Sequence, residues 1–117
     1  MLRLLLVDDD RDGLHMRRLI FEREGYLVFS EGAADGARRT FAENSPEIVV
    51  LDLRLPQAED GLALIREFRE HSPCVRIIVL SGWTGALHGR PEAAMVDALF
   101  EKPVRSAKLV RAVAGIT

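Results

Sequence analysis

The stretch Ile48-Val49-Val50-Leu51-Asp52-Leu53-Arg54-Leu55-Pro56 decides the fold of this chain. Its first four residues are apolar and mostly β-branched, which is typical of a strand buried on both faces of a sheet. Pro56 has no backbone N–H and cannot continue a central strand, so the strand ends near Asp52. The pattern therefore predicts a carboxylate at the end of a buried strand.

Other apolar runs end on polar residues in the same way, and each is read as a strand. They are residues 3–7 before Asp8, Asp9 and Asp10, residues 75–80 before Ser81 and Gly82, and residues 98–100 before Glu101 and Lys102. A fifth, shorter strand is predicted at residues 26–30. Polar residues at the ends of several strands suggest a functional site.

Helical spacing predicts a helix after each strand. The predicted elements are a helix at 12–24, capped by Asp10, stopped by Gly25 and with Met16, Leu19 and Ile20 on its apolar face; a helix with Ala33, Ala37 and Phe41, ending by 44–46; a helix capped by Asp60, running through Glu70; a loop at 82–90; a short helix at 92–97 after Pro91; and a last helix with Leu109, Ala112 and Val113.

Five strands that alternate with five helices, with strands too apolar to be half-exposed, predict an α/β fold. We expect a single domain over residues 1–117 with a doubly wound five-stranded parallel sheet, a flavodoxin-like (βα)5 arrangement of order 2-1-3-4-5. Right-handed crossovers place the carboxyl ends of all strands at one edge of the sheet. Asp8, Asp9 and Asp52 would then share one crevice at the topological switch point.

The composition excludes several classes of protein. A formal charge of −2, with 48% apolar and 29% charged residues, is ordinary for a globular domain and gives no basic field for direct nucleic-acid binding. No apolar run is long enough for a membrane span and no signal peptide opens the chain, so a cytoplasmic location is expected. The single cysteine, Cys74, is predicted to be a buried apolar side chain.

Three neighbouring carboxylates repel one another and need a cation to stay ionised at neutral pH. Mg²⁺ suits this site, because it takes oxygen ligands from one or two carboxylates together with waters and phosphate oxygens. Lys102 would add a positive charge, and the Ser81 hydroxyl can donate to a phosphoryl oxygen. Together these groups would stabilise a phosphoryl group that arrives at the Asp52 carboxylate.

The sequence resembles, over essentially its whole length, the receiver domain of two-component response regulators, of which chemotaxis regulators are an example. The resemblance rests on the order and spacing of Asp8-Asp9, Asp52, Pro56, Ser81 and Lys102-Pro103. It implies a phosphorelay switch rather than an enzyme. In such a domain Asp52 accepts a phosphoryl group from a sensor histidine kinase or a histidine phosphotransfer protein, and the domain assists its own Mg²⁺-dependent phosphorylation and dephosphorylation.

The resemblance also assigns roles to individual residues. Asp9 and Asp52 would bind Mg²⁺ through carboxylates and Arg54 through its backbone carbonyl, while Asp8 would contact the ion through water. Ser81 and Lys102 would draw toward the phosphoryl group and shift the surface around the following elements.

Three departures from the family pattern concern the output. Leu99 stands where most members have an aromatic residue, one extra residue between Pro56 and Gly61 predicts a bulged loop at 57–60, and the segment after Ser81 is shortened. The family's common dimer is therefore not transferred to this chain. The large side chains of Arg54 and Trp83 would flank the path of hydrolytic water, which predicts slow autodephosphorylation.

Two other classes of protein share parts of this pattern. Phosphohydrolases of the haloacid dehalogenase type also use an Asp nucleophile with Mg²⁺, but they place the nucleophile after the first strand and carry a cap domain. A receiver-like docking module that is not phosphorylated is the alternative function, which Leu99 and the altered segment after Ser81 favour. The cognate kinase, the downstream protein, the oligomeric state, and the choice between a stand-alone receiver and a piece of a longer regulator stay open.

Overall fold

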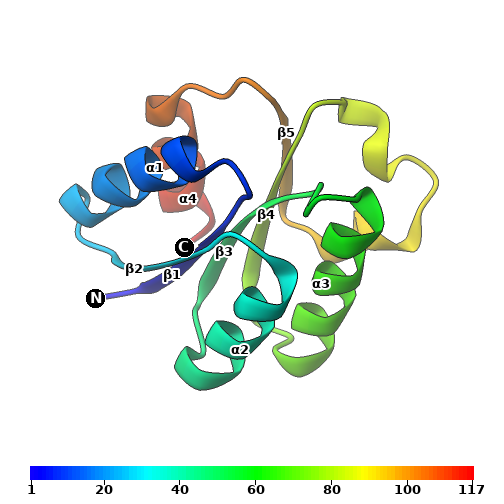
Figure 1. The fold of residues 1–117 in the computed structure, drawn as a ribbon, viewed down its shortest axis with the longest axis horizontal. Coiled ribbons are helices and arrows are strands. Elements are labelled where there is room, and N and C mark those ends of the chain that lie inside the picture. Colours follow the sequence, from blue (N-terminus) through cyan, green and yellow to red (C-terminus); the bar gives the residue numbers. More distant parts are fainter.

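The computed structural model describes the backbone of residues 1–117 and every side chain except that of Thr84. Strands and helices alternate along the whole chain (Figure 1). The elements are β1 (Arg3–Val7), α1 (Arg11–Arg23), β2 (Leu27–Glu31), α2 (Ala34–Asn44), β3 (Ile48–Asp52), α3 (Ala58–His71), β4 (Arg76–Ser81), the 3₁₀ turns η1 (Thr84–Leu87) and η2 (Pro91–Met95), β5 (Ala98–Glu101) and α4 (Ser106–Ile116).

The five strands form one parallel sheet in the order β2-β1-β3-β4-β5, which confirms the predicted fold class. The central strand β3 is buried along its whole length, and Leu51 lies in register between Val7 of β1 and Val79 of β4. Because all strands run in one direction, Asp52 and the residues after Val7 reach the same edge of the sheet. The parallel direction of the strands thus places their polar carboxyl ends at one edge of the sheet.

Helices cover both faces of the sheet (Figure 1). Helices α1 and α4 pack on one face, where Phe21 and Leu109 meet the even-numbered side chains of β1 such as Leu6. Helices α2 and α3 and the turn η1 pack on the other face, where Phe68 and Leu87 meet the odd-numbered ones. The alternation of strand side chains between two buried faces explains why the strands are apolar throughout.

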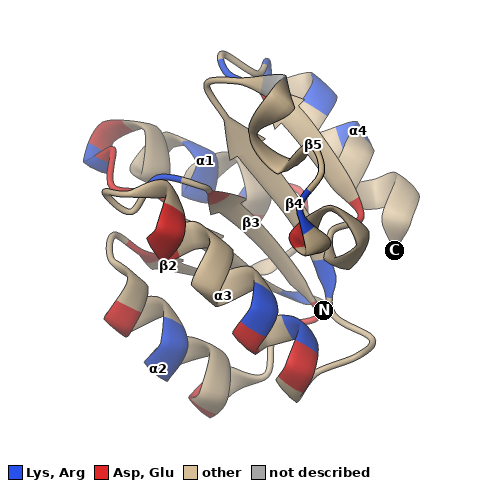
Figure 2. Cartoon of the chain, turned by 90° about the vertical axis from the view of Figure 1, so that its right-hand side faces the viewer, with Lys and Arg blue, Asp and Glu red and all other residues tan. Residues whose placement is uncertain are grey.

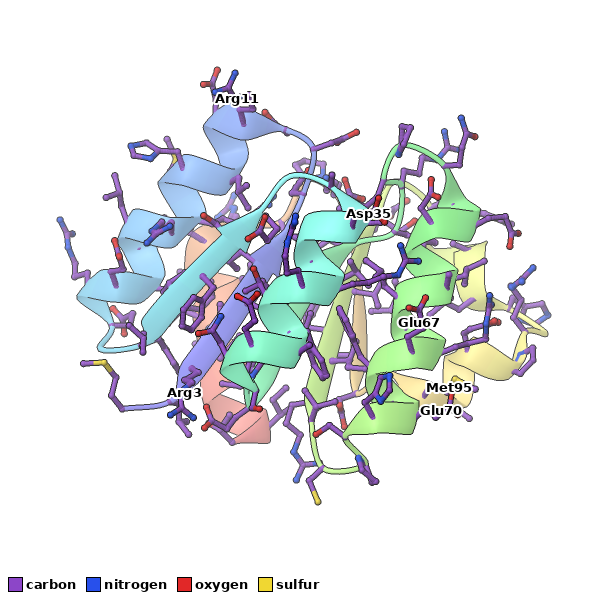
Figure 3. The ribbon with its side chains drawn as sticks, turned by 60° about the horizontal axis from the view of Figure 1, so that its bottom comes forward. Arg3, Arg11, Asp35, Glu67, Glu70 and Met95 are labelled. Atoms are coloured by element: carbon purple, nitrogen blue, oxygen red, sulfur yellow. The ribbon has the colours of Figure 1, made fainter. Side chains whose placement is uncertain are left out.

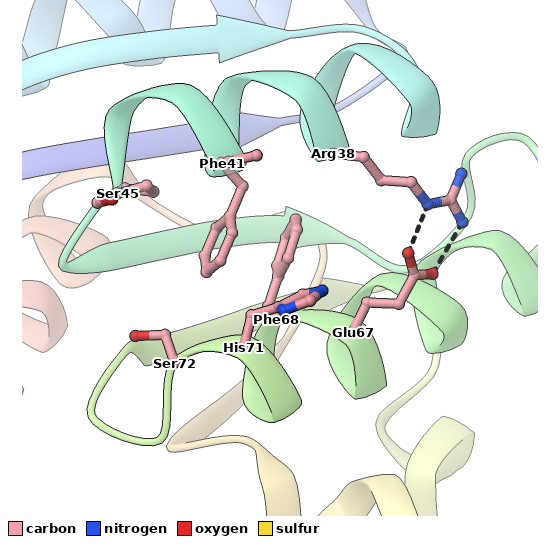
Figure 4. Close-up of a pocket in the computed structure, with 9 residues that line it drawn as sticks. Arg38, Phe41, Ser45, Glu67, Phe68, His71 and Ser72 are labelled. Atoms are coloured by element: carbon pink, nitrogen blue, oxygen red, sulfur yellow. Dashed lines mark hydrogen bonds and ion pairs between the residues drawn. The ribbon is translucent and has the colours of Figure 1, made fainter.

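Helices α2 and α3 are joined by an aromatic pair and an ion pair (Figure 4). The rings of Phe41 and Phe68 stack with centroids 4.1 Å apart, and the Arg38 guanidinium donates to both Glu67 carboxylate oxygens at 2.7 and 3.0 Å. A hollow of about 420 Å³ lies beside them. Its lining includes Pro46 and Ser72, which precede β3 and β4, so it lies at the opposite end of the sheet from Asp52.

The connection between β4 and β5 differs from the prediction. Residues 82–90 include the 3₁₀ turn η1, and the short helix predicted at 92–97 is the 3₁₀ turn η2, which Pro91 begins. Four α-helices and two short turns therefore replace the five predicted helices. Three glycines, at positions 82, 85 and 89, disfavour a full helix here, since each glycine costs about 1 kcal/mol in a helix interior.

Polar contacts with α3 fix this connection. Glu92 is buried and accepts hydrogen bonds from Arg66 at 2.5 Å and from Arg90 at 3.2 Å. The guanidinium of Arg69 donates to the carbonyl of Met95 at 2.7 and 3.0 Å, and Figure 3 shows Met95 beside the second half of α3. Arginine side chains of α3 thus hold the segment around residues 92–97, where the sequence predicted a short helix.

The inward face of α1 was predicted incorrectly. Met16 and Leu19 are 62% and 53% exposed, whereas Phe21 is buried and Leu14 packs against the same core cluster. The face that carries Leu14 and Phe21 lies inward because Phe21 packs over β2. Arg17 lies on the same face and pairs with a buried carboxylate. Hydrophobicity at helical spacing alone did not distinguish the two faces.

The start of α3 was also predicted incorrectly. Gln57 is the N-cap and Asp60 is the third helical residue, which accepts a hydrogen bond from the Gln57 backbone N–H at 3.0 Å in a capping box. Residues 58–60 are already helical, so the expected bulge at 57–60 is absent from this described segment. The lone Cys74, predicted to be buried, is exposed in the turn between α3 and β4.

The surface carries charges of both signs. Figure 2 shows acidic and basic residues interspersed along α2 and α3. Within the part of the chain that the structure describes, every helix is too short or too polar to cross a membrane.

Gly61 allows a close approach of α3 to the end of β3. A Cβ at this position would lie 2.0 Å from the carbonyl oxygen of Leu53, whereas a Cβ at Gly115 of α4 would meet nothing within 4 Å. We expect Gly61→Ala to destabilise the protein by about 2 kcal/mol or more, because backbone atoms must shift. Urea unfolding measures this, with Gly115→Ala as the matched control, and equal stabilities of the two variants would contradict it.

Candidate functional site

Lys102 joins two buried carboxylates at the carboxyl edge of the sheet. Its Nζ donates to Asp52 Oδ2 at 2.9 Å and to Asp8 Oδ2 at 3.2 Å. Asp52 is the last residue of β3 and is 8% exposed, and Asp8 follows β1 and is 1% exposed. Strands β1 and β3 are neighbours in the sheet, and Lys102 enters from the end of β5. Three residues far apart in sequence thus meet at one point.

Asp9 completes an acidic cluster at this edge. It is exposed, and one carboxylate oxygen from each of Asp8, Asp9 and Asp52 lies within 4.8 Å of the others. Oxygen atoms at this mutual distance, from hard anionic donors, fit a hard divalent cation such as Mg²⁺. The sequence prediction that Asp8, Asp9 and Asp52 share one crevice is confirmed as a statement about geometry.

The cluster opens into a hollow of about 640 Å³ whose lining includes Asp9, Asp52, Arg54, Ser81 and Lys102. Ser81 is buried at the end of β4, and its hydroxyl accepts a hydrogen bond from the Trp83 backbone N–H at 3.2 Å. The structure therefore brings every predicted site residue to one edge of the sheet.

Trp83 lines this hollow and is 66% exposed. Its indole ring lies close over Gly85, where a Cβ would come within 2.5 Å of the ring. Arg54 borders the same hollow and is exposed. The two large side chains thus line the same hollow as Asp52 and are exposed to solvent.

Burial and ion pairing shift the pKa values of Asp8, Asp52 and Lys102 in different directions. Burial raises the pKa of Asp52 above its ordinary value, although the pairing with Lys102 opposes this effect. For Asp8, burial would also raise the pKa, but hydrogen bonds from the Asp10 backbone, Arg17 and Lys102 outweigh it and hold the pKa below its ordinary value. Burial would lower the pKa of Lys102, yet its two carboxylate partners raise it.

Arg17 of α1 is a site residue that the sequence reasoning missed. Its Nη1 donates to Asp8 Oδ2 at 2.8 Å. The signal that could have found it is its position three residues after Leu14 and four before Phe21, on the face of α1 that packs against the sheet. An arginine on an inward face needs an anionic partner, and Asp8 follows the neighbouring strand.

Comparison with known proteins identifies this arrangement. The family model described as response regulator receiver domain matches residues 4–114. The chain belongs to this family. Receiver domains are the phosphorylation switches of two-component systems, not enzymes in the usual sense, and they interact with sensor kinases and downstream effectors. In a member of this family, the acidic pocket of Asp8, Asp9 and Asp52 is compatible with Mg²⁺ binding and phosphorylation.

Individual relatives of this receiver domain agree with the family. Nitrogen assimilation regulatory protein NtrX of Azorhizobium caulinodans is 32% identical over 114 residues, which cover 92% of this chain and 24% of that protein. A putative response regulator from Chloroflexus aurantiacus has 28% identity and a TM-score of 0.84, covering 98% of this chain and 96% of that one. The chain spans about a quarter of the length of NtrX and 34% of the transcriptional regulatory protein AruR of Pseudomonas aeruginosa.

The response regulator protein TrrA from Thermotoga maritima, solved in complex with Mg²⁺-BeF, has the same fold. Its TM-score is 0.88 at 22% identity, and the match covers 100% of both chains.

The paired Asp8 of this receiver makes stability depend on pH. Its pKa in the folded protein lies below the unfolded value of about 3.9, so its contribution is present above that pH and is lost as the pH falls through the lower, native pKa. With EDTA present, we expect Asp8→Asn to be less stable than the wild type at pH 7 by about 2 kcal/mol or more, because Arg17 and Lys102 lose an anionic partner. The difference should shrink at acid pH.

Urea unfolding at a series of pH values from 7 to 3 measures this difference. Asp12→Asn is the matched control, since Asp12 is an exposed residue in the first turn of α1. A difference between the wild type and Asp8→Asn that stays constant over the whole series would contradict the prediction.

Proposed function

We propose that residues 1–117 form one receiver domain that accepts a phosphoryl group on Asp52 from the phosphohistidine of a sensor histidine kinase or a histidine phosphotransfer protein. The observation that carries the proposal is the position of Asp52 at the end of β3, 2.9 Å from Lys102 and within the acidic cluster. A carboxylate held at the floor of an open hollow can be reached by a donor from outside. The domain would do this in the cytoplasm.

In the transfer, a carboxylate oxygen of Asp52 forms the new O–P bond as the N–P bond of the donor phosphohistidine breaks. The donor nitrogen keeps the electron pair of that bond. Lys102 is protonated and lies against both Asp52 and Asp8, so its ammonium can follow the charge that develops on the phosphoryl oxygens. Ser81 can turn its hydroxyl from the Trp83 backbone toward the same oxygens.

Asp9 and Asp52 would hold Mg²⁺ with their carboxylates, with the Arg54 carbonyl as a further ligand and Asp8 linked through water. When bound, Mg²⁺ neutralises charge on the phosphoryl oxygens in the transition state. The exposed carboxylate of Asp9 is the member of the cluster open to solvent, which suits a metal ligand that exchanges with water. The complex of TrrA with Mg²⁺-BeF supports the choice of Mg²⁺.

The phosphorylated domain would signal to a downstream protein through the surface near Ser81. The η1 and η2 turns replace a full helix in this region, and Leu99 of β5 packs against the core cluster on the same face. The movement would therefore involve Lys102, Ser81 and the turns that follow Ser81, without rotation of an aromatic ring at position 99.

Labelling with a small phosphodonor tests the phospho-acceptor. The wild type, incubated with acetyl phosphate and Mg²⁺, should gain one phosphoryl group by intact-mass spectrometry, and Asp52→Asn should gain none. Asp9→Asn should be labelled at least about tenfold more slowly because the site loses a metal ligand. Asp35→Asn, on the surface of α2, should behave as the wild type. Lack of labelling of the wild type would favour the docking module.

Arg54 and Trp83 line the hollow that contains Asp52. They should slow hydrolysis of the aspartyl phosphate, because large side chains in this hollow would hinder the approach of water. We expect phosphate to be lost about two- to tenfold faster in Arg54→Ala and Trp83→Ala than in the wild type, which corresponds to roughly 0.4–1.4 kcal/mol in the barrier. The decay of purified phosphoprotein with Mg²⁺ measures this. Rates equal to the wild-type rate in both variants would exclude the idea.

A further inference from the structure

Two cations from different elements hold the buried carboxylate of Asp8. Arg17 of α1 donates to Oδ2 at 2.8 Å, and Lys102 donates to the same oxygen at 3.2 Å. The other oxygen, Oδ1, accepts a hydrogen bond from the Asp10 backbone N–H at 3.0 Å. Both oxygens of Asp8 are therefore bonded by the protein itself.

Arg17 occupies a place in α1 that suits an apolar residue. It lies between Leu14 and Phe21 on the face that packs against the sheet, and its side chain is only 20% exposed. A cation in such a place is costly to bury unless it is paired. The pairing with Asp8 thus fixes the guanidinium next to the acidic cluster and, at the same time, fixes α1 against β1.

The charges at the site are nearly balanced without a metal ion. Three carboxylates, from Asp8, Asp9 and Asp52, lie together, and Lys102 and Arg17 supply two fixed positive charges. A divalent ion that enters this site meets a cluster whose negative charge has been largely compensated. The positive charge of Arg17 repels a divalent cation a few ångströms away. It therefore weakens the net attraction between that cation and the three carboxylates.

We propose that Arg17 is a built-in cation that replaces part of the divalent ion at Asp8, so that the acidic cluster stays assembled without metal and binds Mg²⁺ less tightly than the three carboxylates would otherwise allow. This inference rests on the proposed Mg²⁺ site. It makes Arg17 a positioning residue that sets the metal affinity of the receiver and that takes no part in phosphoryl transfer.

The affinity for Mg²⁺ tests the proposal directly. Trp83, the one tryptophan of the sequence, lines the hollow, so its fluorescence can report a titration with MgCl₂. Arg17→Met removes the charge at similar length, and Arg17→Gln removes the charge but keeps a hydrogen-bond donor. We expect both variants to bind Mg²⁺ about three- to tenfold more tightly than the wild type. Arg17→Lys, which keeps the charge, should stay close to the wild type.

Arg18→Met is the matched control. Arg18 is adjacent on α1 but pairs with Glu22 and Ser30, so its removal should leave the dissociation constant within about twofold of the wild-type value. A second readout is thermal unfolding. In EDTA, Arg17→Met should melt below the wild type, because Asp8 loses a partner, and Mg²⁺ should raise its melting temperature by more than it raises that of the wild type.

The outcomes separate this proposal from the proposed function. If the wild type binds Mg²⁺ and the Arg17→Met and Arg17→Gln variants bind it equally or more weakly, the role of Arg17 is refuted and the metal site stands. If no variant responds to Mg²⁺, the metal site and this proposal both fall. Variants that are unfolded in EDTA but folded in saturating Mg²⁺ would support the proposal, whereas variants that stay unfolded in Mg²⁺ would overturn it.

Discussion

The bridge that Lys102 makes between Asp8 and Asp52 is the interaction on which the rest of the site depends. Two carboxylates that are largely buried would repel each other and favour their neutral forms. A shared ammonium at 2.9 and 3.2 Å lets both remain near each other as anions. The parallel sheet supplies the geometry, because neighbouring strands β1 and β3 deliver the two aspartates side by side and β5 delivers the lysine from the same edge. The fold thus places the two carboxylates close together, and Lys102 offsets the repulsion between them.

The sheet could be predicted from the sequence because its strands are buried on both faces. Such strands read as uninterrupted apolar runs, and a run that ends at Asp52 or Ser81 also shows where the strand stops. Helix ends with a clear local cause were predictable as well. Asp10 caps α1 through its side chain, and Gly25 takes a positive φ of 96° just after that helix. The connection between β4 and β5 was less predictable, because its glycines weaken the helical signal and tertiary contacts with α3 decide what forms there.

The candidate site followed from the same logic, since parallel strands gather their carboxyl ends. Asp8, Asp9, Asp52, Ser81 and Lys102 were all expected at this edge, and the structure brings them together. Arg17 escaped prediction for a physical reason. Periodicity assigns apolar residues to the inward face and charged residues to solvent, so it directed Met16 and Leu19 toward the core. The actual choice of face depends on a pairing between α1 and the end of β1 that a pattern within one helix cannot contain.

The turns between β4 and β5 are attached to α3 by both apolar and polar contacts. Leu87 of η1 is buried in the core cluster, and Ala86 and Met95 pack against it. In addition, Arg66 pairs with Glu92, and Arg69 donates to the carbonyl of Met95. Salt screens ion pairs at the surface, but it screens a pair with a buried carboxylate much less, and Glu92 is 2% exposed. The attachment of the segment next to Ser81 therefore tolerates changes of ionic strength, as the sheet beneath it does.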